Sequence, residues 1–205
     1  MTELLVHSFI TFFVVIDPIG LALIFIGLTR GLSEAERTRE AIKATALACS
    51  ILLAFMFLGA SLMAAIGVSL SALRIAGGLL LFLLAVDMVF ARQSGLRSTT
   101  RSEQAEAERK EDLSVFPLAF PLITGPGAIT TILLLISKTG PAEFLTLLLV
   151  VILVMLITLV SLLFASRIVR VLGETGANVI SRVLGLVLAA LAVQYVIDGI
   201  FGAMA

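Results

Sequence analysis

The chain has 205 residues, of which 60% are hydrophobic and 14% are charged, and its mean hydropathy is +1.18. A typical soluble domain is roughly 25% charged and about 45–50% apolar, so the composition excludes a soluble globular protein and a disordered one. Basic and acidic residues both number 14, which leaves no net charge and no footprint for nucleic-acid binding.

Six apolar runs, separated by charged residues or by a turn, follow one another along the chain. Because a helix needs about 20 apolar residues to cross a bilayer, these runs predict an all-α membrane protein with six transmembrane helices. A turn at residues 67–71 divides one long charge-free stretch into the second and third helices. The predicted helices cover residues 4–29, 42–66, 72–91, 113–137, 142–166 and 179–203.

The basic residues lie mainly on one side of the predicted membrane. Twelve of the 14 Lys and Arg residues fall in the first, third and fifth loops, and only Arg74 and Lys138 fall on the other side. Basic loops stay in the cytoplasm. We therefore expect a multi-pass protein of the cell (inner) membrane with both termini outside and a cytoplasmic polar linker at residues 92–112.

The two halves of the chain are similar at a fixed offset of 108 residues. Each half holds three spans, an odd number, so a duplicated unit must lie in opposite orientations in the membrane. We predict two inverted repeats, residues 1–91 and 113–205, as in many secondary transporters. The matched positions are Pro18 and Pro126, Phe12 and Phe120, Arg74 and Arg182, and Gly77 and Gly185. Gly77, Gly78 and Gly185 are also expected to allow close helix packing.

Proline and glycine interrupt the first and fourth predicted helices at equivalent positions. Proline removes a backbone donor and clashes with the preceding turn, so both helices are predicted to be discontinuous. Open backbone at membrane depth is tolerated only inside the protein or along an aqueous cavity. The N–H groups of two half-helices suit a carboxylate there. The predicted solute-binding residues are Asp17, Pro18, Ile19 and Gly20 in the first helix, and Thr124, Gly125, Pro126, Gly127 and Ala128 in the fourth.

Several polar side chains are candidates for the same cavity. Asp17 is the carboxylate nearest the middle of a span, where a charge costs at least about 2.5–3.5 kcal/mol. It either binds an ammonium group, a coupling Na⁺ or a proton, or caps the second half-helix, and both roles can hold. Thr124, Thr130 and Thr131 offer hydroxyl contacts, and Gln194 either lines the cavity or bonds across helices. Asp87 and Asp198 lie near span ends and are interpreted as interfacial.

The interrupted helices carry two motifs that resemble those of the MarC family of integral membrane proteins, which includes the SnatA-like amino-acid transporters. The resemblance covers nearly the whole chain. It implies an alternating-access carrier of small neutral amino acids such as glycine and alanine. The first motif departs from the family's usual Asn and Pro, because Leu21 and Leu23 stand at those positions. The matching stretches are Asp17-Pro18-Ile19-Gly20 with Phe25 and Leu28-Thr29, and Pro117-Leu118-Ala119-Phe120-Pro121-Leu122 with Gly125-Pro126-Gly127-Ala128-Ile129.

We therefore expect a secondary carrier whose partners are a small solute and the lipid bilayer. The alternatives are an exporter of another small metabolite or organic anion, and a non-transporting scaffold or sensor. An enzyme is not expected, because the chain has one His, one Cys and no His-Glu-x-x-His motif. No cofactor is expected beyond a coupling Na⁺ or H⁺. The sequence also allows a homo-oligomer.

Overall fold

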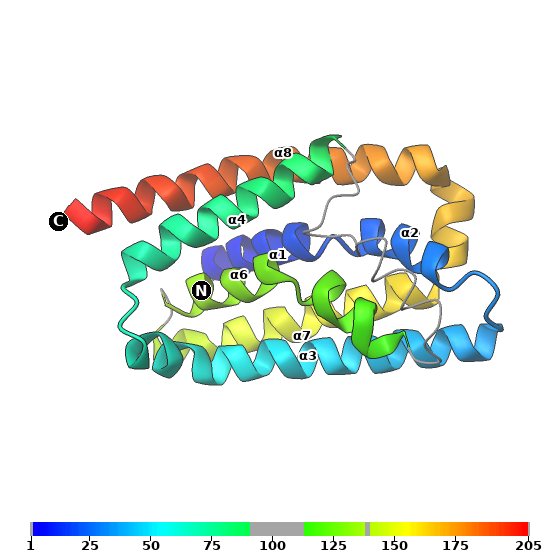
Figure 1. Cartoon of the computed structure of the whole chain (residues 1–205), viewed down its shortest axis with the longest axis horizontal. Coiled ribbons are helices and arrows are strands. Elements are labelled where there is room, and N and C mark those ends of the chain that lie inside the picture. Colours follow the sequence, from blue (N-terminus) through cyan, green and yellow to red (C-terminus); the bar gives the residue numbers. More distant parts are fainter. Residues whose placement is uncertain (1, 91–112, 138–139, 205) are drawn as a thin grey trace.

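The computed structural model describes residues 2–90, 113–137 and 140–204, and all of its regular structure is helical (Figure 1). The linker 92–112 and Lys138, on which part of the orientation prediction depends, lie outside the described residues. The helices are α1 (Thr2–Ile16), α2 (Pro18–Leu28), α3 (Glu34–Ala65), α4 (Leu70–Phe90), η1 (Ser114–Ile123), α6 (Pro126–Ile136), α7 (Pro141–Leu163) and α8 (Ala165–Met204).

Five helical segments in the described part of the chain are long and apolar enough to cross a membrane. A bent pair, η1 and α6, brings the number to six when it is counted as one span. The first span joins α1 and α2, and the last belongs to α8. The predicted turn between the second and third spans is confirmed, because α3 ends at Ala65 and α4 begins at Leu70.

The helices form a bundle in which α3 and α7 lie on one side and α4 and α8 on the other (Figure 1). The two interrupted spans run between these layers and contact both of them. Phe12, Ile16 and Phe25 from the first span, together with Ile132 and Leu134 of α6, are fully buried there. Large apolar side chains cover the outside of the bundle, as a lipid-facing surface requires.

Glycines bring α4 and α8 close together. A methyl group on Gly78 would stand 2.7 Å from the Ala192 carbonyl oxygen, and one on Gly185 would stand 3.2 Å from that of Ala85. The predicted close packing at Gly78 and Gly185 is therefore confirmed. Gly77 packs instead against Thr130 of α6.

The region after the fifth span differs from the prediction. Residues 167–178 were expected to form a loop, but helix α8 begins at Ala165 and bends only at Gly173, where φ is +67°. Glycine enters this left-handed region without steric cost. The bend lets a short helical segment cross from α7 to the long part of α8 (Figure 1).

Candidate functional site

The break in the first span is a single residue, Asp17. Helix α1 ends at Ile16 and α2 begins at Pro18, and Asp17 between them has φ 49° and ψ 68°. In the part of the chain that the structure describes, no other residue except glycine has positive φ. A residue before proline is sterically restricted, so this conformation stores strain. Because such strain is common at functional sites, the backbone geometry also makes Asp17 a candidate functional residue.

The Asp17 carboxylate occupies the N-terminus of α2. Its Oδ1 accepts the Gly20 N–H at 3.1 Å, and the side chain is 1% exposed. It fills the space beside Gly20, where an added methyl group would overlap it and would stand 2.9 Å from Ser181 Oγ of α8. The capping role is confirmed, and the acceptor at this helix end is a side chain of the protein itself.

The break in the fourth span is longer and begins with the wide turns of η1. The Leu118 N–H donates to Leu113 O at 3.3 Å and the Thr124 N–H to Ala119 O at 2.9 Å, each reaching back five residues. Phe116 and Phe120 have extended backbone angles, and each precedes a proline that has no N–H to donate. The axes of η1 and α6 then meet at an angle of 54°.

Helix α6 begins without a side-chain cap. Gly125, its first flanking residue, has an extended backbone (φ −66°, ψ 172°), and Pro126 follows it. The N–H groups of Ala128 and Ile129 bond back to Gly125 O at 3.0 and 3.2 Å. The Gly127 N–H therefore points along the helix axis toward the break. This N–H can donate a hydrogen bond to an anion there.

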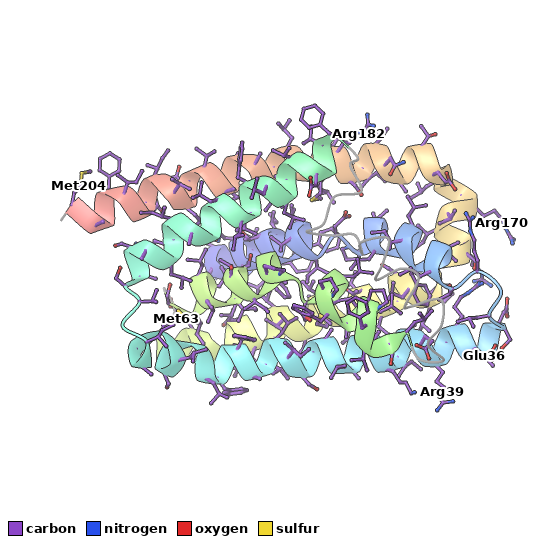
Figure 2. The ribbon with its side chains drawn as sticks, in the orientation of Figure 1. Glu36, Arg39, Met63, Arg170, Arg182 and Met204 are labelled. Atoms are coloured by element: carbon purple, nitrogen blue, oxygen red, sulfur yellow. The ribbon has the colours of Figure 1, made fainter. Side chains whose placement is uncertain are left out.

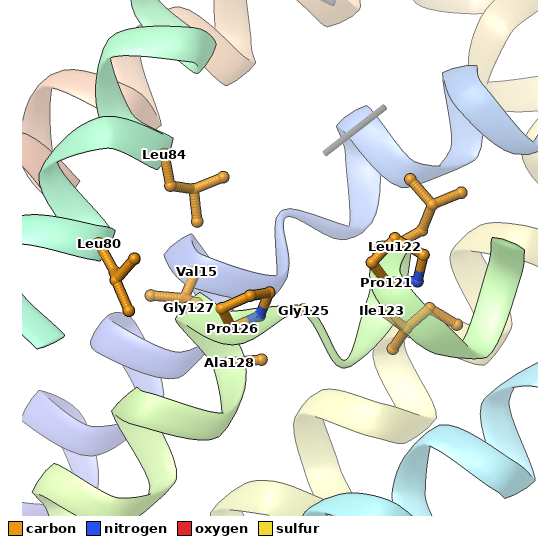
Figure 3. A pocket seen from close by; sticks show the side chains of 10 residues that line it. All are labelled: Val15, Leu80, Leu84, Pro121, Leu122, Ile123, Gly125, Pro126, Gly127 and Ala128. Carbon is orange, nitrogen blue, oxygen red and sulfur yellow. The ribbon is translucent and has the colours of Figure 1, made fainter. Parts of the chain in front are cut away.

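A small cavity lies at this helix end, between α1, α4, η1 and α6 (Figure 3). Its volume of about 20 Å³ has room for about one water molecule. The cavity brings together four of the predicted residues from the fourth span with the end of α1. It is lined by Val15, Leu80, Leu84, Pro121, Leu122, Ile123, Gly125, Pro126, Gly127 and Ala128.

The lining residues Val15, Leu80 and Leu84 were not predicted. They are aliphatic side chains in apolar spans, and no chemical property distinguishes them from their neighbours in the sequence. Only the packing of α4 and α1 against α6 brings them to the cavity.

The other predicted residues lie around this centre or away from it. Asp17 lies two residues beyond Val15, and Pro18, Ile19 and Gly20 continue into α2. The Thr124 hydroxyl donates to Ala119 O at 2.6 Å and the Thr131 hydroxyl to Gly127 O at 2.8 Å, so both bond their own backbone. Gln194 lies on the outer face of α8, where its Nε2 donates to Asp198 Oδ1 at 2.7 Å. The structure does not bring Gln194 to the cavity.

Comparison with known proteins places this bundle in a family. The family model described as MarC family integral membrane protein matches residues 2–204. A UPF0056 membrane protein of Archaeoglobus fulgidus is 41% identical over 94% of this chain and 90% of its own length. The UPF0056 membrane protein YvbG of Bacillus subtilis is 36% identical over 98% and 96%, respectively. No solved structure matches the chain. The chain therefore belongs to the MarC family of integral membrane proteins.

Proposed function

We propose that this protein is a secondary carrier of small neutral amino acids, such as glycine and alanine, and that it works by alternating access. The observation that carries the proposal is the uncapped N-terminus of α6, which opens on a cavity inside the bundle beside the break at Asp17. Non-helical backbone at membrane depth is tolerated where it lines a cavity, and transporters place solute sites at such interruptions.

A zwitterion fits the groups around this cavity. The Gly127 N–H and the positive end of the α6 dipole suit a carboxylate, and the negative charge of Asp17 suits an ammonium group. The walls formed by Val15, Leu80 and Leu84 are aliphatic and favour a small apolar side chain. Because Asp17 already caps α2, the proposal assigns the solute carboxylate to α6 alone.

The packing of the helices supports two discontinuous spans related by an inverted repeat, residues 1–91 and 113–205. Helices α1 and α2 both contact α7, and their counterparts η1 and α6 both contact α3. In the same way, α2 contacts α8, and its counterpart α6 contacts α4. Exchanging the halves maps each of these contacts onto its counterpart. The pair α4 and α8, the third span of each half, maps onto itself.

The cavity volume of about 20 Å³ is smaller than any amino acid. We infer that this structure represents a closed conformation and that the cavity widens toward one side of the membrane at a time. The coupling ion in this proposal is Na⁺ or H⁺, with no other cofactor. The orientation that we propose has both termini outside and the linker 92–112 in the cytoplasm.

The second candidate is an exporter of another small metabolite or organic anion. An uncapped helix N-terminus favours any small carboxylate, so this feature alone does not select an amino acid. A scaffold or sensor is the third candidate, but such a protein has no need of interrupted helices around a cavity.

Uptake by proteoliposomes tests the proposal. Labelled glycine and alanine should accumulate under a Na⁺ or H⁺ gradient, and a labelled organic anion without an ammonium group should not. In Asp17→Asn the cap acceptor remains and the charge is lost, so uptake should fall roughly tenfold or more, the value of a charged hydrogen bond. Failure of the wild type to take up or exchange any small amino acid would overturn the proposal, and unchanged uptake by Asp17→Asn would refute the role of its charge.

A further inference from the structure

Two hydroxyl groups on α1 are buried without a hydrogen-bond partner. Ser8 and Thr11 are each 1% exposed, and neither Ser8 Oγ nor Thr11 Oγ1 makes a hydrogen bond. Hydroxyls in helices commonly bond the carbonyl four residues earlier. Thr131 of α6 and Thr158 of α7 do so, at 2.8 Å in both cases. Thr45 of α3 and Ser181 of α8 share the state of Ser8 and Thr11, but Ser8 and Thr11 lie in successive turns of one helix.

Leaving such a group unpaired costs about 1–3 kcal/mol. An aliphatic side chain at either position would avoid this cost in the closed bundle. Because two unpaired hydroxyls lie in successive turns of one helix, we expect a second conformation in which water or a solute reaches them.

The two hydroxyls lie on α1 between the cavity and the N-terminal end of that helix. Ser8, Thr11 and Val15 have the spacing of a single helix face, and Val15 lines the cavity, where its Cγ1 would lie 3.8 Å from a methyl group on Gly127 of α6. Helix α6 runs antiparallel to α1 (Figure 1). Thr131, one turn after Gly127, therefore lies at the level of Thr11.

This face continues toward the end of the bundle at which both chain termini lie (Figure 1). Its polar groups come from the two elements that also form the cavity wall. The seam between α1 and α6, defined here by Ser8, Thr11 and Thr131, thus runs from the level of the cavity toward that end.

We propose that the α1–α6 seam is the solute path between the cavity and the end of the bundle that carries the termini. When α1 and α6 separate, the Ser8 and Thr11 hydroxyls bind water and the polar groups of a small hydrophilic solute. When the helices close, as here, the path is sealed. This inference rests on the proposed carrier function, because a protein without transport has no use for an opening seam.

Cysteine labelling in proteoliposomes tests the seam. Cys49 is the only cysteine in the chain, so Cys49→Ala gives a background without thiols. In that background Ser8→Cys and Thr11→Cys should react with a small charged methanethiosulfonate reagent added from the side of the termini. Added glycine or alanine should slow the reaction.

Two matched variants provide the controls. Thr158→Cys replaces a threonine that is equally buried but bonded within its own helix, and it should stay unlabelled. Ile10→Cys lies on the same helix but is 46% exposed on the outside of the bundle, so it faces lipid and should resist a charged reagent. Unfolding in detergent should expose all four thiols, and this measures the total that can react.

The outcomes separate the seam from the carrier proposal. Labelling of positions 8 and 11 but not of position 158 supports the seam. Equal inertness of positions 8, 11 and 158 in a preparation that still transports amino acids overturns it. If the seam is labelled but no amino acid is taken up or protects it, the path stands and the proposed solute is wrong.

Discussion

At the scale of single residues, the membrane-embedded polar groups of this protein fall into two kinds. Some bond the backbone of their own helix, as Asp17 does with Gly20 and Thr131 with Gly127, and this bond offsets part of the cost of burial. Others are buried with an unpartnered atom, as Ser8, Thr11 and Asp87 are. The second kind lowers stability, so these positions are candidates for selection by function rather than by folding.

Asp87 gives a stability prediction at this scale. The side chain is 9% exposed, although the sequence placed it at an interface, and its Oδ2 has no hydrogen-bond partner. It lies on α4 one turn beyond Leu84, on the same helix face as the cavity-lining leucines. Replacing Asp87 with Leu should therefore raise the free energy of unfolding by about 1–3 kcal/mol.

Thermal unfolding in detergent measures this effect. Asp198→Leu is the control, because the Asp198 carboxylate accepts a hydrogen bond from Gln194 at 2.7 Å and its loss should give no stabilisation. A fall in the unfolding temperature of Asp87→Leu would show that the carboxylate has a stabilising role that its contacts do not account for.

At the scale of helices, the places where helices begin, end and bend show what the sequence can and cannot predict. Helix boundaries fall at Asp17 and at Gly125, where the sequence has proline and glycine, because these residues change backbone geometry wherever they occur. The helical segment from Ala165 to Gly173 was not predicted, since its charges resemble those of a loop. The capping of α2 by Asp17 was one of two roles that the sequence left open and that can hold together, and the hydrogen bond from the Gly20 N–H shows the capping role.

Glycine substitutions test the packing of α4 against α8. A methyl group on Gly78 would stand 2.7 Å from both Ala192 O and Val196 Cγ2, so Gly78→Ala must push the helices apart and should cost about 1–3 kcal/mol. Gly27 of α2 has nothing within 4 Å of the added methyl. Gly27→Ala should therefore be neutral or stabilising by up to about 1 kcal/mol. Equal unfolding temperatures for the two variants would contradict the close approach.

The start of α3 gives a pH-dependent prediction. The Ser33 hydroxyl donates to the Glu36 carboxylate at 2.7 Å, the Ser33 N–H donates to it at 2.8 Å, and the Glu36 N–H donates back to Ser33 Oγ at 3.3 Å. These hydrogen bonds, first the one from the side chain and then the one from the backbone, hold the pKa of Glu36 below its ordinary value. The charged form is therefore favoured in the folded helix.

The sign of the effect follows from this direction. The capping contribution of Glu36 is fully present above the ordinary carboxyl pKa and is lost as the pH falls through the lowered one. Protection of the first α3 amides from hydrogen exchange should exceed that of Glu36→Gln at neutral pH, and the difference should vanish in acid. The carboxylate is solvent-exposed, so the effect stays local. A difference in amide protection that grew toward acid would contradict this prediction.

At the scale of the whole molecule, a group of charged side chains and the chain termini lie at opposite ends of the bundle. Glu36, Arg39 and Arg170 lie at one end of the bundle, whereas Met63 and Met204 lie at the other (Figure 2). Both termini share the second end (Figure 1). The sequence could predict this segregation because helix count and loop charge are properties of the chain alone. It could not identify the cavity wall or the seam, because these depend on which helix faces meet.

Reporter fusions test the orientation that follows. Basic segments remain in the cytoplasm during insertion, so the end that carries Arg39 and Arg170 should be cytoplasmic and the end with the termini should be outside. Alkaline phosphatase, which matures only outside the cytoplasm, should be active after Ala205 and inactive when inserted in residues 92–112, and a fluorescent protein should show the opposite pattern. Fluorescence after Ala205 with an inactive phosphatase there would invert the molecule and turn the α1–α6 seam toward the cytoplasm, and the same cysteines would then be labelled from the other side.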